Sequence, residues 1–235
     1  MPVYRFFSPS QFNKNSAISL EAEETRHLRT VLRLKTGDKI EIINGKLQLA
    51  TGHITSLSAE SATVQIDQLI EAAPPKRVRI LVQALTKPAL LEWIIEKASE
   101  LGITHFILAP SKRSELTVIS PSRKARLEAI AISAMKQCGR LDLPEIQIVG
   151  QFSEIVLPDK TAIFFGDLRA KAPPFLSAIS TGDIASCIGP ESGFTDDEIT
   201  FMERKWGAKG VRIATHTLRA ETAAITFAAL QDQQE

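Results

Sequence analysis

The sequence has few of the residues that a disulfide-stabilised, zinc-dependent or membrane-spanning protein needs. Its two cysteines, Cys138 and Cys187, have no C-x-x-C partner, and its four histidines are scattered singly. Neither a disulfide framework nor a metal site is therefore predicted. No apolar run approaches the roughly 18 residues of a membrane span, and residues 1–8 lack the apolar core of a secretion signal. We expect a soluble, cytoplasmic protein without a membrane partner.

The chain also has almost no net charge, but its charges are unevenly distributed. The formal net charge is +1, yet residues 76–143 carry 12 Lys and Arg against 6 Asp and Glu. Residues 144–235 carry 8 against 13, and residues 1–75 carry 8 of each kind. The basic middle part indicates a patch for a polyanion, RNA or DNA, with an ordinary solvated basic face as the alternative.

Residues 1–72 have the pattern of a small β-rich domain. Strands are predicted at 3–7 and 63–70, and a hairpin joins strand 40–43 to strand 46–49 across Asn44-Gly45. A helix is predicted at 21–32. Short strands with one helix favour a compact β-barrel.

Composition changes after Ala72-Ala73-Pro74-Pro75, so residues 73–235 are predicted to form a second domain. Apolar runs alternate there with helical patterns, which is typical of an α/β domain with a mostly parallel sheet. The predicted strands are 78–85, 105–109, 162–165, 184–188 and 211–213. The predicted helices are 88–101, 122–138, 195–206 and 218–230.

Two strand-loop-helix turns near the C-terminus predict a cofactor pocket. In the first, strand 184–188 ends at Gly189 and Pro190, and Thr195 and Glu198 have the spacing of a helix capping box. In the second, strand 211–213 leads through polar residues into the last helix. Such turns commonly hold a nucleotide-like ligand.

These turns carry a recognisable signature. Gly189-Pro190-Glu191-x-Gly193-Phe194, followed by Leu218-Arg219-x-Glu221-Thr222-Ala223, resembles the cofactor signature of the SPOUT methyltransferases and, within them, of the RsmE-type family. The resemblance implies a knotted α/β domain after a PUA-like barrel, and a homodimer. It also implies transfer of a methyl group from S-adenosylmethionine to N3 of a uridine in 16S rRNA, within the assembled small ribosomal subunit.

The resemblance extends to the N-terminal domain. His27, Val31-Leu32-Arg33 and Gly37-Asp38 match a segment of the PUA-like RNA-binding domain. Guanidinium groups suit phosphates and stack on bases, although the cluster could be only the wet face of a helix. The residues predicted to contact RNA are Arg26, His27, Arg29, Arg33, Lys35, Lys87, Arg113 and Arg140.

The same resemblance assigns residues to the cofactor and the reaction. Cofactor contacts are expected at Phe165, Gly166, Ile188, Gly189, Pro190, Glu191, Gly193, Ile213, Thr217 and Leu218. Because uridine N3 carries a proton, Arg219 is predicted to stabilise the uracil anion and Glu191 to accept the proton or orient the base. Alternatively, Arg219 binds phosphate or pairs with Glu221, and Glu191 only fixes its loop.

Four residues depart from the family pattern, among them Cys138, which replaces a usual serine. Ser192 and Ala214 stand where glycine is usual, and a positive φ would strain a serine. His216 stands where arginine is common, and we take it as structural. The departures leave open a catalytically silent ribosome-assembly factor, and another RNA nucleotide is an alternative target. Glu96 and Glu100 are expected to be structural partners of Lys97 or of arginines elsewhere.

Overall fold

The computed structural model describes residues 4–169, 171–179 and 181–232. Val3, which begins the first predicted strand, lies outside these residues. The chain divides into two compact units: Met1–Pro74 with Met135–Leu143, and Pro75–Ala134 with Pro144–Glu235. Among the described residues, no helix is long and apolar enough to cross a membrane.

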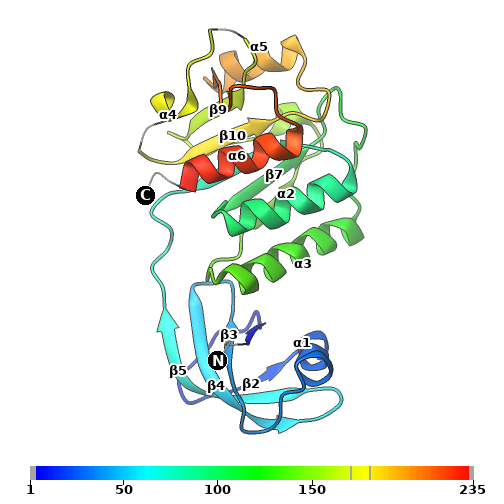
Figure 1. The fold of residues 1–235 in the computed structure, drawn as a ribbon, viewed down its shortest axis with the longest axis vertical. Helices are drawn as coiled ribbons and strands as arrows, with labels where there is room; N and C mark the ends of the chain where they lie inside the picture. The colour runs from blue at the N-terminus through cyan, green and yellow to red at the C-terminus, as the bar shows by residue number, and fades with distance from the viewer. Residues whose placement is uncertain (1–3, 170, 180, 233–235) are drawn as a thin grey trace. The chain divides into compact units, whose positions relative to one another are not determined.

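The first unit contains a five-stranded sheet in the order β1-β3-β4-β5-β2 (Figure 1). Its strands are β1 (Arg5–Phe7), β2 (Ala17–Leu20), β3 (Lys39–Ile43), β4 (Gln48–Leu57) and β5 (Ala62–Glu71). The pairing is antiparallel except between β1 and β3.

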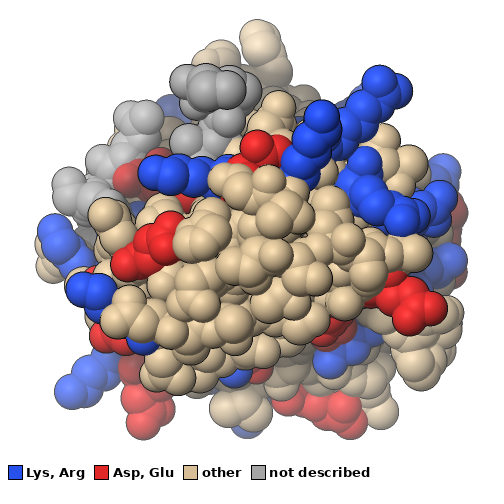
Figure 2. All heavy atoms as spheres, turned by 90° about the horizontal axis from the view of Figure 1, so that it is seen from below, with Lys and Arg blue, Asp and Glu red and all other residues tan. Residues whose placement is uncertain are grey.

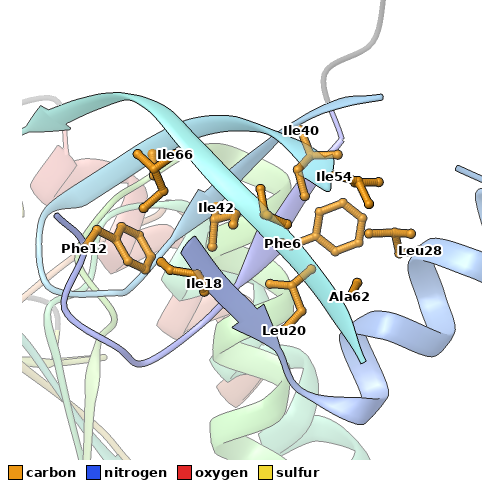
Figure 3. Close-up of a cluster of buried hydrophobic side chains, with 12 residues drawn as sticks. Phe6, Phe12, Ile18, Leu20, Leu28, Ile40, Ile42, Ile54, Ala62 and Ile66 are labelled. Carbon is orange, nitrogen blue, oxygen red and sulfur yellow. The ribbon is translucent and has the colours of Figure 1, made fainter. Parts of the chain in front are cut away.

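The sheet of the first unit curls around one apolar core (Figure 3). Phe6 on edge strand β1 and Leu20 on edge strand β2 belong to the same buried cluster as Ile54 on the central strand β4. The ladder between β4 and β5 shifts register between Thr51 and Gly52. At Gly52 an added Cβ would lie 2.1 Å from a backbone oxygen of β5, so only glycine allows this close approach.

The predicted two-residue turn at Asn44-Gly45 is wrong in register. Strands β3 and β4 pair Ile43 with Leu49, so the connection is residues 44–47. The buried Asn44 side chain accepts hydrogen bonds from the backbone N–H groups of Lys46 and Gln48 at 2.8 and 3.2 Å. Asparagine therefore builds a wider turn around its own side chain.

The predicted helix 21–32 is present in two parts. Helix α1 (Ala22–Arg26) continues into a π-helical turn, His27–Val31. Arg33 then adopts the left-handed conformation with φ 55°. Because a π turn is wider than an α-helical turn, its side chains face other directions than a regular helix would give them. Val31, which the helical pattern placed on the apolar side, is 65% exposed. Such turns are uncommon and often occur at functional sites.

The second unit is built on a six-stranded, fully parallel sheet in the order β11-β9-β10-β6-β7-β8. Its strands are β6 (Arg79–Ala84), β7 (His105–Ala109), β8 (Glu145–Ile148), β9 (Ala162–Gly166), β10 (Ile184–Ile188) and β11 (Lys209–Val211). The predicted parallel α/β domain is confirmed, whereas β8 was not predicted. The implied trefoil knot stays a prediction.

Helices cover both faces of this sheet. Along β10, Ala185 and Cys187 share an apolar cluster with Met202 of α5 (Asp196–Lys205). Ser186 points to the opposite face, where Gln231 of α6 (Ala220–Asp232) donates a hydrogen bond to its hydroxyl oxygen. This alternation is the period-2 pattern of a strand that is buried on both sides.

The remaining helices are α2 (Pro88–Glu100), α3 (Pro121–Cys138) and the short α4 (Phe175–Ala178), which was not predicted. Figure 1 shows α2 beside α6 on one face of the sheet. Lys97 of α2 donates hydrogen bonds to both Glu96 and Glu100, at 2.7 and 2.9 Å. The structural role expected for these two carboxylates is therefore confirmed.

Candidate active site

A pocket of about 290 Å³ opens at the carboxyl ends of three neighbouring strands of the second unit. Strands β9, β10 and β11 run parallel, so the segments that follow Gly166, Ile188 and Val211 meet at one edge of the sheet. Ligands of open α/β sheets bind in this position. The pocket therefore lies where the two predicted turns converge.

Nearly all the residues predicted to contact a cofactor line this pocket. They are Gly166, Ile188, Gly189, Pro190, Glu191, Gly193, Ile213, Thr217 and Leu218. Phe165 does not line it. Its side chain is fully buried in the apolar cluster beneath the sheet edge, because β9 alternates its side chains and Phe165 points into the core.

The loop at residues 189–195, here called the cofactor loop, is closed by a tight turn. The backbone N–H of Gly193 donates to the carbonyl oxygen of Pro190 at 2.8 Å, and Gly193 has φ +70°. At Gly189 an added Cβ would lie 3.0 Å from the backbone nitrogen of Phe194 and 3.1 Å from Gly193. Both glycines are therefore required by backbone geometry.

Ser192 is not strained. It is absent from the residues with positive φ, and the left-handed position falls on Gly193 instead. The strain expected at Ser192 is therefore wrong, because the turn places its unusual backbone conformation one residue later. Its hydroxyl group donates to the carbonyl oxygen of Arg113 at 3.3 Å.

The cofactor loop ends in the predicted capping box. Thr195 Oγ1 accepts a hydrogen bond from the backbone N–H of Glu198 at 3.3 Å, and Glu198 Oε2 accepts one from the backbone N–H of Thr195 at 2.8 Å. The buried Glu198 carboxylate also accepts the backbone N–H of Lys112 at 2.7 Å. A hydrogen bond from the Lys112 ammonium lowers the pKa of the neighbouring Asp197.

The opposite wall of the pocket offers unused backbone groups. Among the described residues, none accepts a hydrogen bond from the backbone N–H groups of residues 213–219, and none donates to the carbonyl oxygens of 213–218. Backbone polar groups are normally paired. A segment of free donors and acceptors beside an apolar hollow suits a ligand with a polar edge, such as a nucleoside.

The two predicted catalytic residues lie at the mouth of the pocket or beside it. Arg219 is exposed, immediately before α6, between Leu218 and Ala220 of the pocket wall. Its side chain makes no hydrogen bond or ion pair with any described residue, so the alternative pairing with Glu221 is absent. Glu191 lines the pocket, and from the described part of the chain it accepts a single long hydrogen bond, 3.4 Å, from the backbone N–H of Lys87.

Some lining residues were not predicted. Burial raises the pKa of the Cys187 thiol, so it is no nucleophile. His216, which we took as structural, is exposed and lines the pocket. Asp167 lines it too and accepts a hydrogen bond from Arg169 Nε at 2.7 Å. The position of Asp167 directly after a strand was the one signal that could have indicated it.

The predicted RNA-contacting residues of the first unit share one feature: all are exposed. They are Arg26 at the end of α1, His27 and Arg29 on the π-helical turn, and Arg33 and Lys35 just after it. Figure 2 shows Lys and Arg side chains around the rim of the visible face, most densely at its upper right, with Asp and Glu among them and a largely uncharged centre. RNA binding by this cluster stays a prediction.

Of the other three predicted RNA contacts, two are already engaged by the protein. Arg140 binds the Asp142 carboxylate with two nitrogens, and its side chain is only 11% exposed. Arg113 donates to carbonyl oxygens of the cofactor loop. Lys87 is exposed just before α2. The described residues contain no group of three or more His, Cys, Asp or Glu side chains that could hold a metal ion.

A parallel sheet with a pocket at its carboxyl edge, preceded by a small β unit with exposed arginines, defines a two-domain α/β protein with a ligand-sized pocket. Residues 74–231 match the model of the RNA methyltransferase domain, and residues 20–67 match that of the RNA methyltransferase PUA domain. The chain therefore belongs to this RNA methyltransferase family.

Relatives of known name agree over nearly the whole chain. A ribosomal RNA small subunit methyltransferase E from Rickettsia conorii is 27% identical over 96% of this chain and 93% of its own. That of Bacillus subtilis is 25% identical over 94% and 93%. The structure of the Neisseria gonorrhoeae enzyme bound to S-adenosylmethionine has a TM-score of 0.87 and 25% identity, covering 99% of this chain and 98% of its own.

Proposed function

We propose that this protein transfers a methyl group from S-adenosylmethionine to N3 of a specific uridine in 16S rRNA. The family membership supports RNA methyl transfer, and the relatives named small subunit methyltransferase E support the small-subunit rRNA as substrate. The uridine N3 target comes from the resemblance of the two cofactor turns to the RsmE-type family. Structures similar over almost the full chain, from Neisseria gonorrhoeae and Legionella pneumophila, contain S-adenosylmethionine.

The observation that carries the proposal is the pocket between the cofactor loop and residues 213–218. Its residues fit the donor: Ile188 and Leu218 offer apolar walls, and the unpaired backbone groups of 213–218 offer hydrogen bonds to adenine and ribose. When bound, S-adenosylmethionine supplies an electrophilic methyl group. The protein then contributes mainly by holding the acceptor nitrogen in line with that group.

Arg219 and Glu191 are proposed to act on the uracil. The unpartnered guanidinium of Arg219 stabilises the negative charge that develops on a uracil oxygen as the N3 proton leaves. Glu191 receives that proton or orients the base, because its carboxylate has only one weak contact. Both residues border the pocket and remain unused by the fold.

The exposed basic cluster of the π-helical turn is proposed to bind the rRNA backbone. A PUA-type RNA domain at residues 20–67 supports this role. We further propose a homodimer that acts in the cytoplasm on the assembled small ribosomal subunit, as the family resemblance implies.

The proposal is tested by incubating the protein with small subunits that lack the modification and with labelled S-adenosylmethionine. We expect one labelled uridine in 16S rRNA, located by mass spectrometry as the N3-methyl derivative. Label on a different nucleotide would support the assignment as an RNA methyltransferase but would show that uridine N3 is not its target. If calorimetry detects no donor binding and no label is transferred, a silent assembly factor becomes the better conclusion.

A further inference from the structure

The loop that follows β7 and the cofactor loop hold each other through Arg113. Its Nη1 donates to the backbone carbonyl oxygens of Ser192 at 3.0 Å and of Phe194 at 3.3 Å. In return, the Ser192 hydroxyl donates to the carbonyl oxygen of Arg113 at 3.3 Å. These three hydrogen bonds, here called the Arg113 clasp, join residues 79 or 81 positions apart in the sequence.

The clasp acts on both sides of the left-handed glycine of the cofactor loop. Ser192 and Phe194 flank Gly193, which has φ +70° and open space where a side chain would be. No other described residue donates a hydrogen bond to either of these two carbonyl oxygens. The N–H groups of the same two peptides donate to Pro190 O and to Glu198 Oε2, each at 2.8 Å. Arg113 therefore holds the carbonyl ends of two peptide groups whose N–H ends are held within the loop and its helix cap.

The other contacts of the loop do not replace the clasp. Among the described residues, Glu191 accepts just the 3.4 Å hydrogen bond from Lys87, on the N-terminal side of Gly193. The bond from the Gly193 N–H to Pro190 O at 2.8 Å joins the loop to itself and not to another element. The capping box begins at Thr195, after it. A bond from a charged donor is stronger than a neutral one, so loss of the guanidinium affects this stretch most.

We propose that Arg113 is a positioning residue for the methyl donor, not a contact for RNA phosphate. It holds the backbone of residues 192–194 in the shape that lines the pocket. This inference rests on the proposed function, because it assigns a role toward the donor in the same pocket. Ser192, a departure from the family pattern, completes the clasp and is a feature of this chain.

The test compares Arg113→Ala with Arg123→Ala, which removes the same charge from α3, where the Arg123 side chain has no hydrogen bond with a described residue. Hydrogen exchange of the amides of residues 191–194 is measured in the free protein. Affinity for S-adenosylhomocysteine is measured by calorimetry. For Arg113→Ala we expect faster exchange and about tenfold weaker binding, the size of one good hydrogen bond.

Further variants sharpen the result. Arg113→Lys should recover part of the affinity, because an ammonium can still donate to one carbonyl oxygen. Ser192→Ala should give a smaller loss, since it removes one neutral hydrogen bond only. Arg123→Ala should leave both exchange and donor affinity at the wild-type value.

The proposal is overturned if Arg113→Ala keeps wild-type exchange and donor affinity but lowers the salt slope of RNA binding by about one, as loss of a phosphate contact does. If the wild-type protein binds no donor, the proposed function fails by itself. The hydrogen-exchange rates then still test whether Arg113 holds the cofactor loop. Unchanged exchange in Arg113→Ala refutes this role, and faster exchange supports it.

Discussion

At the scale of single residues, Arg219 and Arg113 show how similar side chains acquire different roles. Arg113 is engaged with backbone carbonyl oxygens, whereas Arg219 is exposed with no partner among the described residues. An arginine that is hydrogen-bonded to backbone carbonyl oxygens can hold a loop of the protein in place. A free arginine beside a pocket is available to a substrate, so the two are expected to affect different steps of the reaction.

Arg219→Ala is predicted to reduce kcat by about 10²- to 10³-fold, the loss seen when a donor to a developing oxyanion is removed. Donor affinity should change little, because the Arg219 side chain does not line the pocket. Methyl transfer and calorimetry are measured on the same preparation, with Arg204→Ala of α5 as the control. Equal losses in turnover and in donor binding would contradict the substrate-side role.

Gly189→Ala is predicted to destabilise the protein by about 1–3 kcal/mol, the usual cost of overpacking, and to weaken donor binding. The new Cβ would meet the rigid backbone of Gly193 and Phe194 at 3.0 to 3.1 Å. The matched control is Gly150→Ala, whose nearest neighbour is the flexible Glu154 carboxylate at 3.5 Å. Denaturant unfolding and calorimetry report the two effects, and identical behaviour of both variants would refute the prediction.

At the scale of elements, the cofactor loop and helix α5 form one unit. The loop ends at the Thr195 cap, and Glu198 ties the first turn of the helix to Lys112 in the loop after β7. A local sequence signal therefore positions a wall of the pocket. Loss of the cap should therefore lower the stability of helix α5 and weaken ligand binding in the pocket.

Thr195→Ala is predicted to lower the free energy of unfolding by about 1 kcal/mol, the typical value of an N-cap. The Glu198 carboxylate would lose its hydrogen bond from the Thr195 hydroxyl. Thr195→Ser retains a hydroxyl group and should be close to wild type. Urea denaturation measures both variants, and a serine variant as unstable as the alanine variant would show that the threonine methyl, not the cap, is responsible.

At the scale of the whole molecule, the chain divides its work between two units. The second unit contains the pocket proposed to hold the methyl donor, and the first carries exposed basic residues on and beside a π-helical turn. Affinity for RNA should therefore depend on the first unit without any change in donor binding. RNA affinity and donor affinity can therefore be used to test the roles of the two units separately.

The double charge reversal Arg29→Glu and Arg33→Glu is predicted to weaken RNA binding and to flatten its dependence on salt, since fewer counterions are released. Affinity for S-adenosylmethionine should stay at the wild-type value. Filter binding over a series of salt concentrations gives the slope. Lys14→Glu and Lys39→Glu, two exposed lysines of the same unit, provide a control of equal charge. An unchanged slope would leave the basic cluster as ordinary solvated surface.

The sequence by itself determined the features that depend on neighbours in the chain. The alternation of apolar runs predicted the parallel sheet, the spacing of Thr195 and Glu198 predicted the capping box, and Gly189 and Gly193 predicted the bends of the cofactor loop. Each signal is local, because capping, backbone freedom and strand burial are properties of a few consecutive residues.

Only the tertiary structure decided which distant residues meet. It placed Arg113 against the cofactor loop and Phe165 beneath the pocket, and it brought Asp167 and His216 into the pocket wall. It also decided that the left-handed position falls on Gly193 and not on Ser192. These outcomes depend on how strands β9, β10 and β11 are ordered in the sheet, and periodicity along one segment contains no information about the neighbours that packing will bring to it.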